Sequence, residues 1–358
     1  MAKTPLQNQP VSPSRQAQNI AATSRSPMPN AGAAGADPAT PEADVNAPAT
    51  VSTQRSVGAV SLHIGVNSVD PAAYGGWSGA LSGCENDARS MAAIAGVEGF
   101  TASTLLTRQA TSANVLAAIQ DAADGLASGS TFFLTYAGHG AQVPNLNGDD
   151  EEVDNKDETW VLWDRMLLDD ELRQAFAAFA SGVRIVLLSD SCHSGTIYRR
   201  HDSIQQIRDA ASKRDFYQNL VADTREGAGA VPRFGPLQGN GIQRVTTREL
   251  PYEVNSLVLI NNLDQYRQLQ AQSRAAGAIA ASGLSISGCA DNQLSQEIGG
   301  AGVFSTRVRA TWAQNNFAGS YRQFHREILS QMLPNQTPQL GLFGTNPQQL
   351  AEDTPFNP

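Results

Sequence analysis

The pattern of apolar positions divides the chain into two unlike parts near residue 57. Residues 1–56 are rich in Ala, Pro, Ser, Gln and Asn, contain no Phe, Tyr or Trp, and have Leu6 and Ile20 as nearly their only large aliphatic residues. Such a segment buries too little apolar surface to offset the entropy that ordering would cost. We therefore predict that residues 1–56 form a disordered N-terminal tail.

From Val57 onward, apolar runs alternate with amphipathic segments. Short apolar runs predict strands, and apolar residues spaced three and four apart predict helices. The predicted strands cover residues 59–69, 102–107, 131–137, 159–163, 183–189, 256–260, 283–289 and 339–343. The predicted helices include residues 88–95, 111–122, 169–180, 304–312 and 321–332. Continuous apolar runs mark strands buried on both faces, so this alternation predicts an α/β fold with a mostly parallel central sheet and helices on both faces.

The predicted elements group into one domain that an irregular stretch interrupts. The domain covers residues 57–345, with a first part at 57–200 and a second at 256–345. Between them, residues 201–255 are polar and irregular and are predicted to be an exposed insertion or linker. Residues 346–358 are predicted to be a C-terminal tail.

Composition and charge argue against several classes of function. The formal net charge is −9 and the pI is near 5.1, whereas a nucleic-acid partner held through its phosphates needs clustered Lys and Arg. No window approaches the roughly 18 to 20 consecutive apolar residues of a membrane span, and we expect no secretory signal. The three cysteines, Cys84, Cys192 and Cys289, lack the spacing of a disulfide framework, which favours a reducing compartment such as the cytoplasm.

Two sequences that directly follow apolar runs carry residue types suited to nucleophilic catalysis. In an open parallel sheet, ligands bind beyond the carboxyl ends of the strands. His139 follows TFFLT and Cys192 follows VRIVLLS, so one sheet edge would hold an imidazole and a thiol. The imidazole can withdraw the thiol proton, and N–H groups near Gly140 and Gly195 could hold the oxyanion that forms when the thiolate attacks a carbonyl. Either residue alone is usually an ordinary part of the structure, but the combination favours catalysis.

The histidine and cysteine segments resemble the two signatures of metacaspases, the caspase-like cysteine peptidases of plants, fungi, protists and bacteria. Five blocks match the family in order: GCENDA at 83–88, YAGHG at 136–140, DDEL at 169–172, DSCHSG at 190–195 and SGCADNQ at 287–293. Five ordered blocks are far more specific than any one of them. The chain is similar to the type I pattern, and its Ala- and Gly-rich composition favours a prokaryotic source.

This resemblance implies the caspase-type (caspase-hemoglobinase) α/β sandwich and the activity of a cysteine endopeptidase. It implies that His139 is the general base and that Cys192 is the nucleophile that forms an acyl-thioester. The backbone amides of Gly140 and Cys192 would hold the oxyanion. No organic cofactor is then required, and the protein is expected to be a monomer, as metacaspases generally are.

The resemblance also implies cleavage after Arg or Lys, because the family's acidic pocket positions correspond to Asp87 and Asp190. Two converging carboxylates would select a cation over other side chains. Ordinary roles remain open, since Asp87 can stabilise the first turn of a helix and Asp190 can form a turn. Ala137 stands where the family often has a Ser in the pocket wall, so one hydroxyl contact to the substrate would be absent.

An acidic stretch at residues 148–158 suggests calcium, because carboxylate oxygens are the ligands this ion prefers. Many metacaspases are activated by calcium, and Asp157, Asp169 and Asp170 correspond to family ligands. A fourth family carboxylate is replaced by Arg199, whose charge opposes a dication, and charge runs are often only solvated loops.

Some relatives process themselves after Lys or Arg in the region that follows the nucleophile. The candidates for such self-cleavage here are Arg199, Arg200, Lys213, Arg214 and Arg225. Exposed charge without any processing is the alternative.

Two rival functions remain open. One is a caspase-fold scaffold that has lost activity and only binds, against which the intact His139 and Cys192 count. The other is a related Cys/His hydrolase that acts after Asp or Asn. Protein or peptide substrates with Arg or Lys before the cleaved bond are the partners we expect, and nucleic acid and membrane are not.

Overall fold

The computed structural model describes residues 58–146, 156–192, 245–273, 277–290, 293–315 and 317–358. The predicted tail at 1–56 lies outside these residues, as does most of the insertion. The part of the insertion that is described, 245–255, holds a short strand and the start of a helix. Within the described ranges, no helix has the length and apolar character that crossing a bilayer requires.

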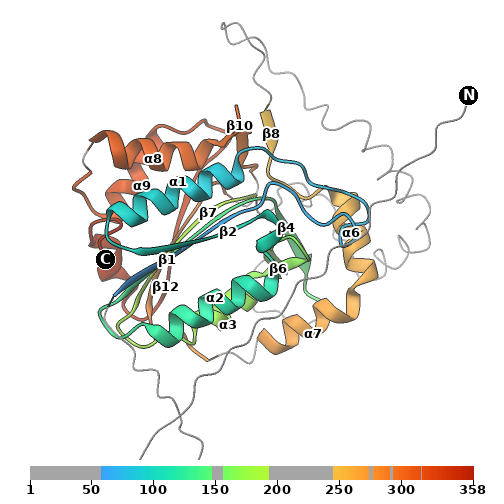
Figure 1. The fold of residues 1–358 in the computed structure, drawn as a ribbon, viewed down its shortest axis with the longest axis horizontal. Helices are drawn as coiled ribbons and strands as arrows, with labels where there is room; N and C mark the ends of the chain where they lie inside the picture. Colours follow the sequence, from blue (N-terminus) through green and yellow to red (C-terminus); the bar gives the residue numbers. More distant parts are fainter. Residues whose placement is uncertain (1–57, 147–155, 193–244, 274–276, 291–292, 316) are drawn as a thin grey trace, which may run out of the picture. The chain divides into compact units, whose positions relative to one another are not determined.

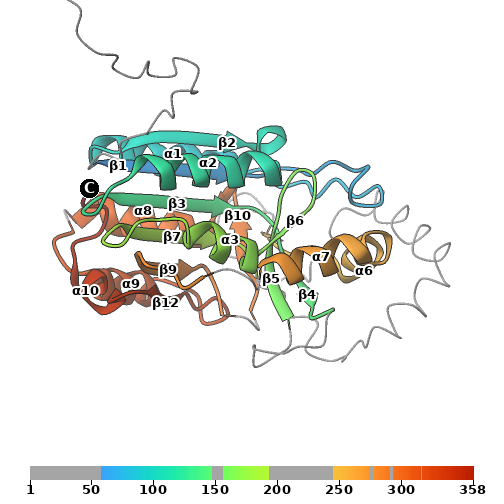
Figure 2. The ribbon, with the colours of Figure 1, turned by 90° about the horizontal axis from the view of Figure 1, so that it is seen from below.

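A six-stranded sheet forms the centre of the fold, in the order β12-β9-β7-β3-β1-β2 (Figures 1 and 2). Its strands are β1 (Ala59–Gly65), β2 (Thr101–Leu106), β3 (Thr131–Ala137), β7 (Arg184–Asp190), β9 (Ser282–Ser287) and β12 (Gln339–Gly344). All neighbours run parallel except β12, which pairs antiparallel with β9. Every residue of β3 is buried, as its continuous apolar run predicts.

Helices cover both faces of this sheet, and each face has its own hydrophobic cluster. One face carries α1 (Cys84–Val97), α8 (Val303–Asn315) and α9 (Tyr321–Ser330), and the other carries α2 (Ser112–Gly125) and α3 (Asp169–Phe176) (Figure 1). The first face is packed through residues such as Met91 and Phe304, and the second through Ile119 and Leu172. The predicted α/β sandwich with a mostly parallel sheet is confirmed.

Two small antiparallel sheets lie beyond the carboxyl ends of the central strands. One consists of β4 (Gly140–Pro144), β5 (Lys156–Val161) and β6 (Met166–Leu168). The other consists of β8 (Val245–Thr247), β10 (Gln296–Ile298) and β11 (Ala301–Gly302). A one-turn 3-10 helix, η1 (Thr107–Gln109), follows β2.

The strand predicted at residues 256–260 is wrong, because these residues lie in helix α6 (Tyr252–Asn261), which is followed by α7 (Leu263–Ser273). A short apolar run does not by itself distinguish a buried strand from a buried helix. Here Val254, Leu257 and Val258 have helical spacing and join the hydrophobic cluster on the α2 face. The helix satisfies its own backbone, so the run needs no strand partner.

Residues 346–358 are not a tail that extends from the domain. They include α10 (Pro347–Glu352), and Leu350, Ala351 and Phe356 are buried in the cluster on the α1 face. The ring of Phe356 packs against Phe133, with 4.9 Å between the ring centroids. This segment therefore completes the core.

Candidate active site

The carboxyl ends of β3 and β7 lie level with each other. Their register pairs Ala137 with Asp190. His139 and Cys192 each follow their strand by two residues, so both lie at the same edge of the sheet. The structure thus places both residues of the predicted dyad at one edge of the sheet, and no hydrogen bond joins His139 Nδ1 to the Cys192 thiol.

The imidazole of His139 is held from two sides. Its Nε2 donates to the carbonyl oxygen of Gly79 at 3.1 Å, and the ring of Trp77 covers it at 4.9 Å between centroids. Since a carbonyl only accepts, Nε2 carries the hydrogen, and Nδ1 keeps a lone pair that has no hydrogen-bond partner in the described part of the chain. Burial lowers the pKa of His139 to about 4, and the nearby backbone of Gly79 and Glu249 opposes this only in part. The ring is therefore a neutral base at pH 7.

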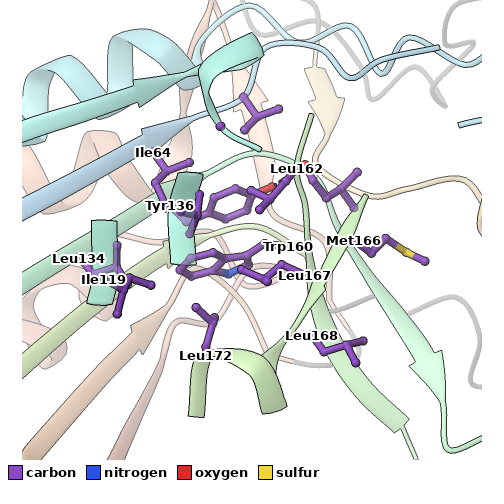
Figure 3. Packing of buried hydrophobic residues seen from close by; sticks show 14 of the residues in the cluster. Ile64, Ile119, Leu134, Tyr136, Trp160, Leu162, Met166, Leu167, Leu168 and Leu172 are labelled. Atoms are coloured by element: carbon purple, nitrogen blue, oxygen red, sulfur yellow. Dashed lines mark hydrogen bonds between the residues drawn. The ribbon is translucent and has the colours of Figure 1, made fainter. Parts of the chain in front are cut away.

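Tyr136 fixes the backbone on which this imidazole is carried. Its hydroxyl donates to the carbonyl oxygens of His139 at 2.7 Å and Val161 at 3.1 Å. Its ring stacks on Trp160, with 4.5 Å between centroids and 11° between planes (Figure 3). Ile64 and Leu172 belong to the same packed cluster. Tyr136 thus connects the backbone of His139 to the packed core.

The thiol of Cys192 lies in a closed environment. Its Sγ accepts the N–H of Ser295 at 2.8 Å and lies 3.4 Å from the carbonyl oxygen of the same residue. Burial raises the pKa of the Cys192 thiol, and the neighbouring Cys289 and Glu249 add to this effect. In this state the cysteine is therefore a protonated thiol.

Two backbone amides next to these side chains point at one oxygen atom. The N–H groups of Gly140 and Cys192 donate to the carbonyl oxygen of Arg248 at 3.0 and 3.2 Å. A Cβ at position 140 would lie 1.7 Å from the Cys192 carbonyl oxygen, so only glycine fits this close approach. A pair of converging N–H donors is the geometry that stabilises an oxyanion.

The side chain of Arg248 enters a pocket lined by carboxylates. Its Nη2 lies 2.6 Å from Asp87 Oδ2 and its Nη1 lies 3.0 Å from Asp190 Oδ2. A third carboxylate, Glu297, lies 3.4 Å from Nη2. The Arg248 side chain is 0% exposed. The pocket therefore holds a fully buried guanidinium.

Neighbouring backbone and hydroxyl groups hold the pocket carboxylates in place. Gly302 N–H donates to Asp87 Oδ2 at 2.9 Å, and Ser305 donates to Asp190 Oδ2 through its N–H at 3.0 Å and its hydroxyl at 2.6 Å. Burial raises the pKa of Asp87 to about 6, although the Arg248 guanidinium opposes this. Burial also acts to raise the pKa of Glu297, but hydrogen bonds from Ser82 and the charge of Arg248 outweigh it, so that pKa is lowered.

Ala137 lies close to two of the pocket carboxylates. It lines a cavity of about 10 Å³ together with Asp87, Asp190 and Ser305. That volume is about the smallest that can hold one water molecule.

Sequence reasoning missed Glu297, Ser295 and Arg248. Glu297 lies on β10, four residues beyond the SGCADNQ block, and its position could have marked it as an additional acid. Nothing local distinguishes Arg248 from the other arginines after Cys192, because only the fold brings it to the pocket.

The three expected calcium ligands do not form a site by themselves. Asp157 Oδ2 accepts from Gln270 Nε2 at 2.5 Å, Asp169 Oδ1 accepts the N–H of Asp170 at 2.9 Å, and Asp170 pairs with Arg173 at 3.2 Å. Among the residues with described positions, no group of three or more His, Cys, Asp or Glu side chains has a metal-binding arrangement. Most of the acidic stretch lies outside those residues, as do the five self-cleavage candidates, one of which is Arg199.

Comparisons with known proteins identify the family of this chain. The caspase domain family matches residues 64–348. Metacaspase-4 of Arabidopsis thaliana is 29% identical over 182 residues, 48% of this chain and 40% of that protein. Metacaspase-1 of Cryptococcus neoformans is 33% identical over 152 residues, 38% of this chain and 31% of that protein. The chain thus spans less than half of the length of these relatives.

A solved structure extends the comparison over most of the chain. A protein of Geobacter sulfurreducens shares 37% identity and a TM-score of 0.66, covering 84% of this chain and 98% of that one. The family match covers most of the described fold, including His139, Cys192 and the pocket carboxylates. The chain therefore belongs to the caspase domain family, and part of it is similar to metacaspases.

Proposed function

We propose that this protein is a cysteine endopeptidase that hydrolyses peptide bonds after Arg or Lys, with Cys192 as nucleophile and His139 as general base. One observation carries the proposal. Arg248 has its guanidinium among three carboxylates while its carbonyl oxygen receives the N–H groups of Gly140 and Cys192. A substrate arginine bound in the same way would have its scissile carbonyl beside the nucleophile.

The reaction follows from the groups at this edge. His139 Nδ1 accepts the Cys192 proton, and Sγ attacks the carbonyl carbon while the two amides stabilise the oxyanion. When the C–N bond breaks, His139 returns the proton to the leaving nitrogen and an acyl-thioester remains on Cys192. Water then hydrolyses the thioester, which releases a carboxylate and restores the thiol.

The pocket favours a cation by charge and by geometry. Truncating one partner of a buried charge pair commonly costs about 2 to 5 kcal/mol, so the pocket carboxylates can dominate the choice of side chain. An arginine forms a planar fork that reaches Asp87 and Asp190 at once, whereas a lysine offers a single point charge. We expect Arg to be preferred over Lys, and acidic side chains to be rejected.

Calcium stimulation is carried forward from the family resemblance alone, since the described residues do not form a site for the ion. No step of the mechanism above passes through a metal. The cytoplasmic location and the monomeric state also stay predictions.

A fluorogenic peptide library that varies the residue before the cleaved bond tests the proposal, with and without millimolar calcium. We expect turnover on Arg and Lys peptides that is absent in Cys192→Ala. Dominant cleavage after Asp or Asn would contradict the pocket argument. If no peptide is cleaved, Cys192 resists covalent inhibitors and the chain does not cut itself, the protein is the binding scaffold instead.

A further inference from the structure

Residues 245–250 lie along the candidate active site in the manner of a bound peptide substrate. Strand β8 pairs antiparallel with β10, with Val245 opposite Ile298 and Thr247 opposite Gln296. The N–H of Arg248 then donates to the carbonyl oxygen of Ser295 at 2.9 Å. Extended peptides are commonly recognised by adding a strand to an exposed sheet edge in this way.

The pairing continues on the other side of Arg248. The N–H of Leu250 donates to the carbonyl oxygen of Gly140 at 2.9 Å, and Gly140 forms a parallel bridge with Glu249. The chain therefore runs without interruption from the β10 edge, past Cys192 and His139, to the β4 edge. The peptide bond between Arg248 and Glu249 lies between these two anchors.

Arg248 satisfies two separate requirements of a substrate residue. Its side chain pairs with Asp87, Asp190 and Glu297, and its carbonyl oxygen receives both oxyanion-type N–H groups. An arginine with only a structural role would need the ion pairs, but its carbonyl oxygen would not need to accept the N–H groups of Gly140 and Cys192. Their coincidence in one residue points to recognition as a substrate.

We infer that the intact chain carries its own substrate segment at residues 245–250, and that the Arg248–Glu249 bond is cleaved in cis by Cys192. The inference rests on the proposed peptidase function and specifies how the site is regulated. Until this bond is cleaved, the segment occupies the cation pocket and the oxyanion donors, so external substrates are excluded.

Self-cleavage follows the same steps as the proposed hydrolysis of an external peptide. The thiol proton passes to His139, and a bond forms between Sγ and the Arg248 carbonyl carbon. The C–N bond to Glu249 breaks, and its nitrogen takes the proton from His139 to become a new amino terminus. Water hydrolyses the thioester, leaves Arg248 with a carboxylate and restores the thiol.

Residues 245–250 exclude external substrates effectively because they belong to the same chain as the active site. A tethered segment acts at an effective concentration in the millimolar range or above, which an external peptide at micromolar concentration cannot match. Cleavage leaves one fragment that ends at Arg248 and one that begins at Glu249. Both fragments supply strands to the central sheet, β7 from the first and β9 and β12 from the second, so we expect them to stay associated.

The site of cleavage is tested by intact mass and N-terminal sequencing of purified full-length chain. We expect fragments 1–248 and 249–358 from the wild type, an uncut Cys192→Ala chain, and appearance of the fragments at a first-order rate that is independent of protein concentration. Added active enzyme should leave Cys192→Ala uncut at Arg248, because its own site shields that bond. Cleavage only at another Lys or Arg, or a rate proportional to concentration, would overturn the inference.

Variants at position 248 separate this inference from the proposed function. Arg248→Gln should lower the rate of self-cleavage after residue 248 at least a hundredfold, whereas Arg248→Lys should retain cleavage at a reduced rate. Arg225→Gln is the matched control and should cleave itself at the wild-type rate. Because Arg248→Gln leaves buried carboxylates unpaired, the lysine variant keeps the test valid if the glutamine variant does not fold. If the wild type cleaves Arg peptides but never cuts itself at 248, the inference fails while the function stands. If it cleaves nothing, the function fails.

Discussion

Asp190→Asn tests the cation pocket most directly. Asp190 Oδ2 lies 3.0 Å from Arg248 Nη1, and the two side chains are 2% and 0% exposed. The amide would remove the charge and replace one acceptor by a donor that faces the guanidinium. Losing one partner of such a buried pair costs about 2 to 5 kcal/mol, which corresponds to a loss in kcat/KM of roughly 30-fold to several thousandfold at about 1.4 kcal/mol per tenfold.

The assay compares two peptides that differ only in Arg or citrulline before the cleaved bond. With turnover expressed per chain already cut after Arg248, we expect Asp190→Asn to lower kcat/KM for the Arg peptide by the stated factor and to change the citrulline peptide far less, because citrulline lacks the charge. Asp264→Asn, at a fully exposed carboxylate, is the matched control. Equal losses on both peptides would mean that Asp190 supports the fold rather than selecting a cation, and unchanged activity on Arg would mean that the pocket lies elsewhere.

Three further changes test other parts of the site and the fold. Cys192→Ala should abolish peptide turnover, whereas Cys84→Ala should retain it, as measured with the Arg peptide; turnover in the first variant would exclude the proposed nucleophile. Gly302→Ala should lower that turnover at least a hundredfold, because its Cβ would lie 2.1 Å from the nearest pocket carboxylate oxygen, while Gly277→Ala meets nothing within 4 Å and should change little. Burial lowers the pKa of His63 to about 3. Below about pH 6.5 the unfolded chain therefore binds a proton at His63 that the folded protein does not bind, so the free energy of unfolding falls as the pH drops. In a Cys192→Ala background, His63→Gln should reduce the loss of unfolding free energy between pH 7 and pH 5 by about 2 kcal/mol in urea titrations; an unchanged loss would contradict this cause.

The sequence predicts the central sheet well because its strands carry the signal within themselves. β3 contains the continuous apolar run FFL and β7 contains IVLL, and burial on both faces requires that pattern. Once these two strands are parallel neighbours, the residues that follow them must lie at one edge. The positions of His139 and Cys192 therefore follow from local sequence and topology together.

The remaining features depend on contacts between distant parts of the chain. Residues 256–260 form a helix because α6 packs its spaced apolar residues against the core, which a five-residue window does not reveal. Residues 346–358 lack a long periodic pattern, yet Phe356 fills a space among aromatic rings from β3 and α8. In the site, Arg248 meets Asp87 across 161 positions of sequence, and no local pattern encodes such a pairing.

The anchoring of residues 245–250 differs on the two sides of the Arg248–Glu249 bond. Upstream, three-residue β8 pairs with β10 and Arg248 fills the pocket. Downstream, Leu250 is buried and leads into α6, whose apolar residues belong to the main core cluster. We expect cleavage to release the upstream side, because cleavage removes its covalent connection to this core anchor. The new amino terminus at Glu249 would stay beside His139, while the pocket and the β10 edge become open to an external Arg peptide.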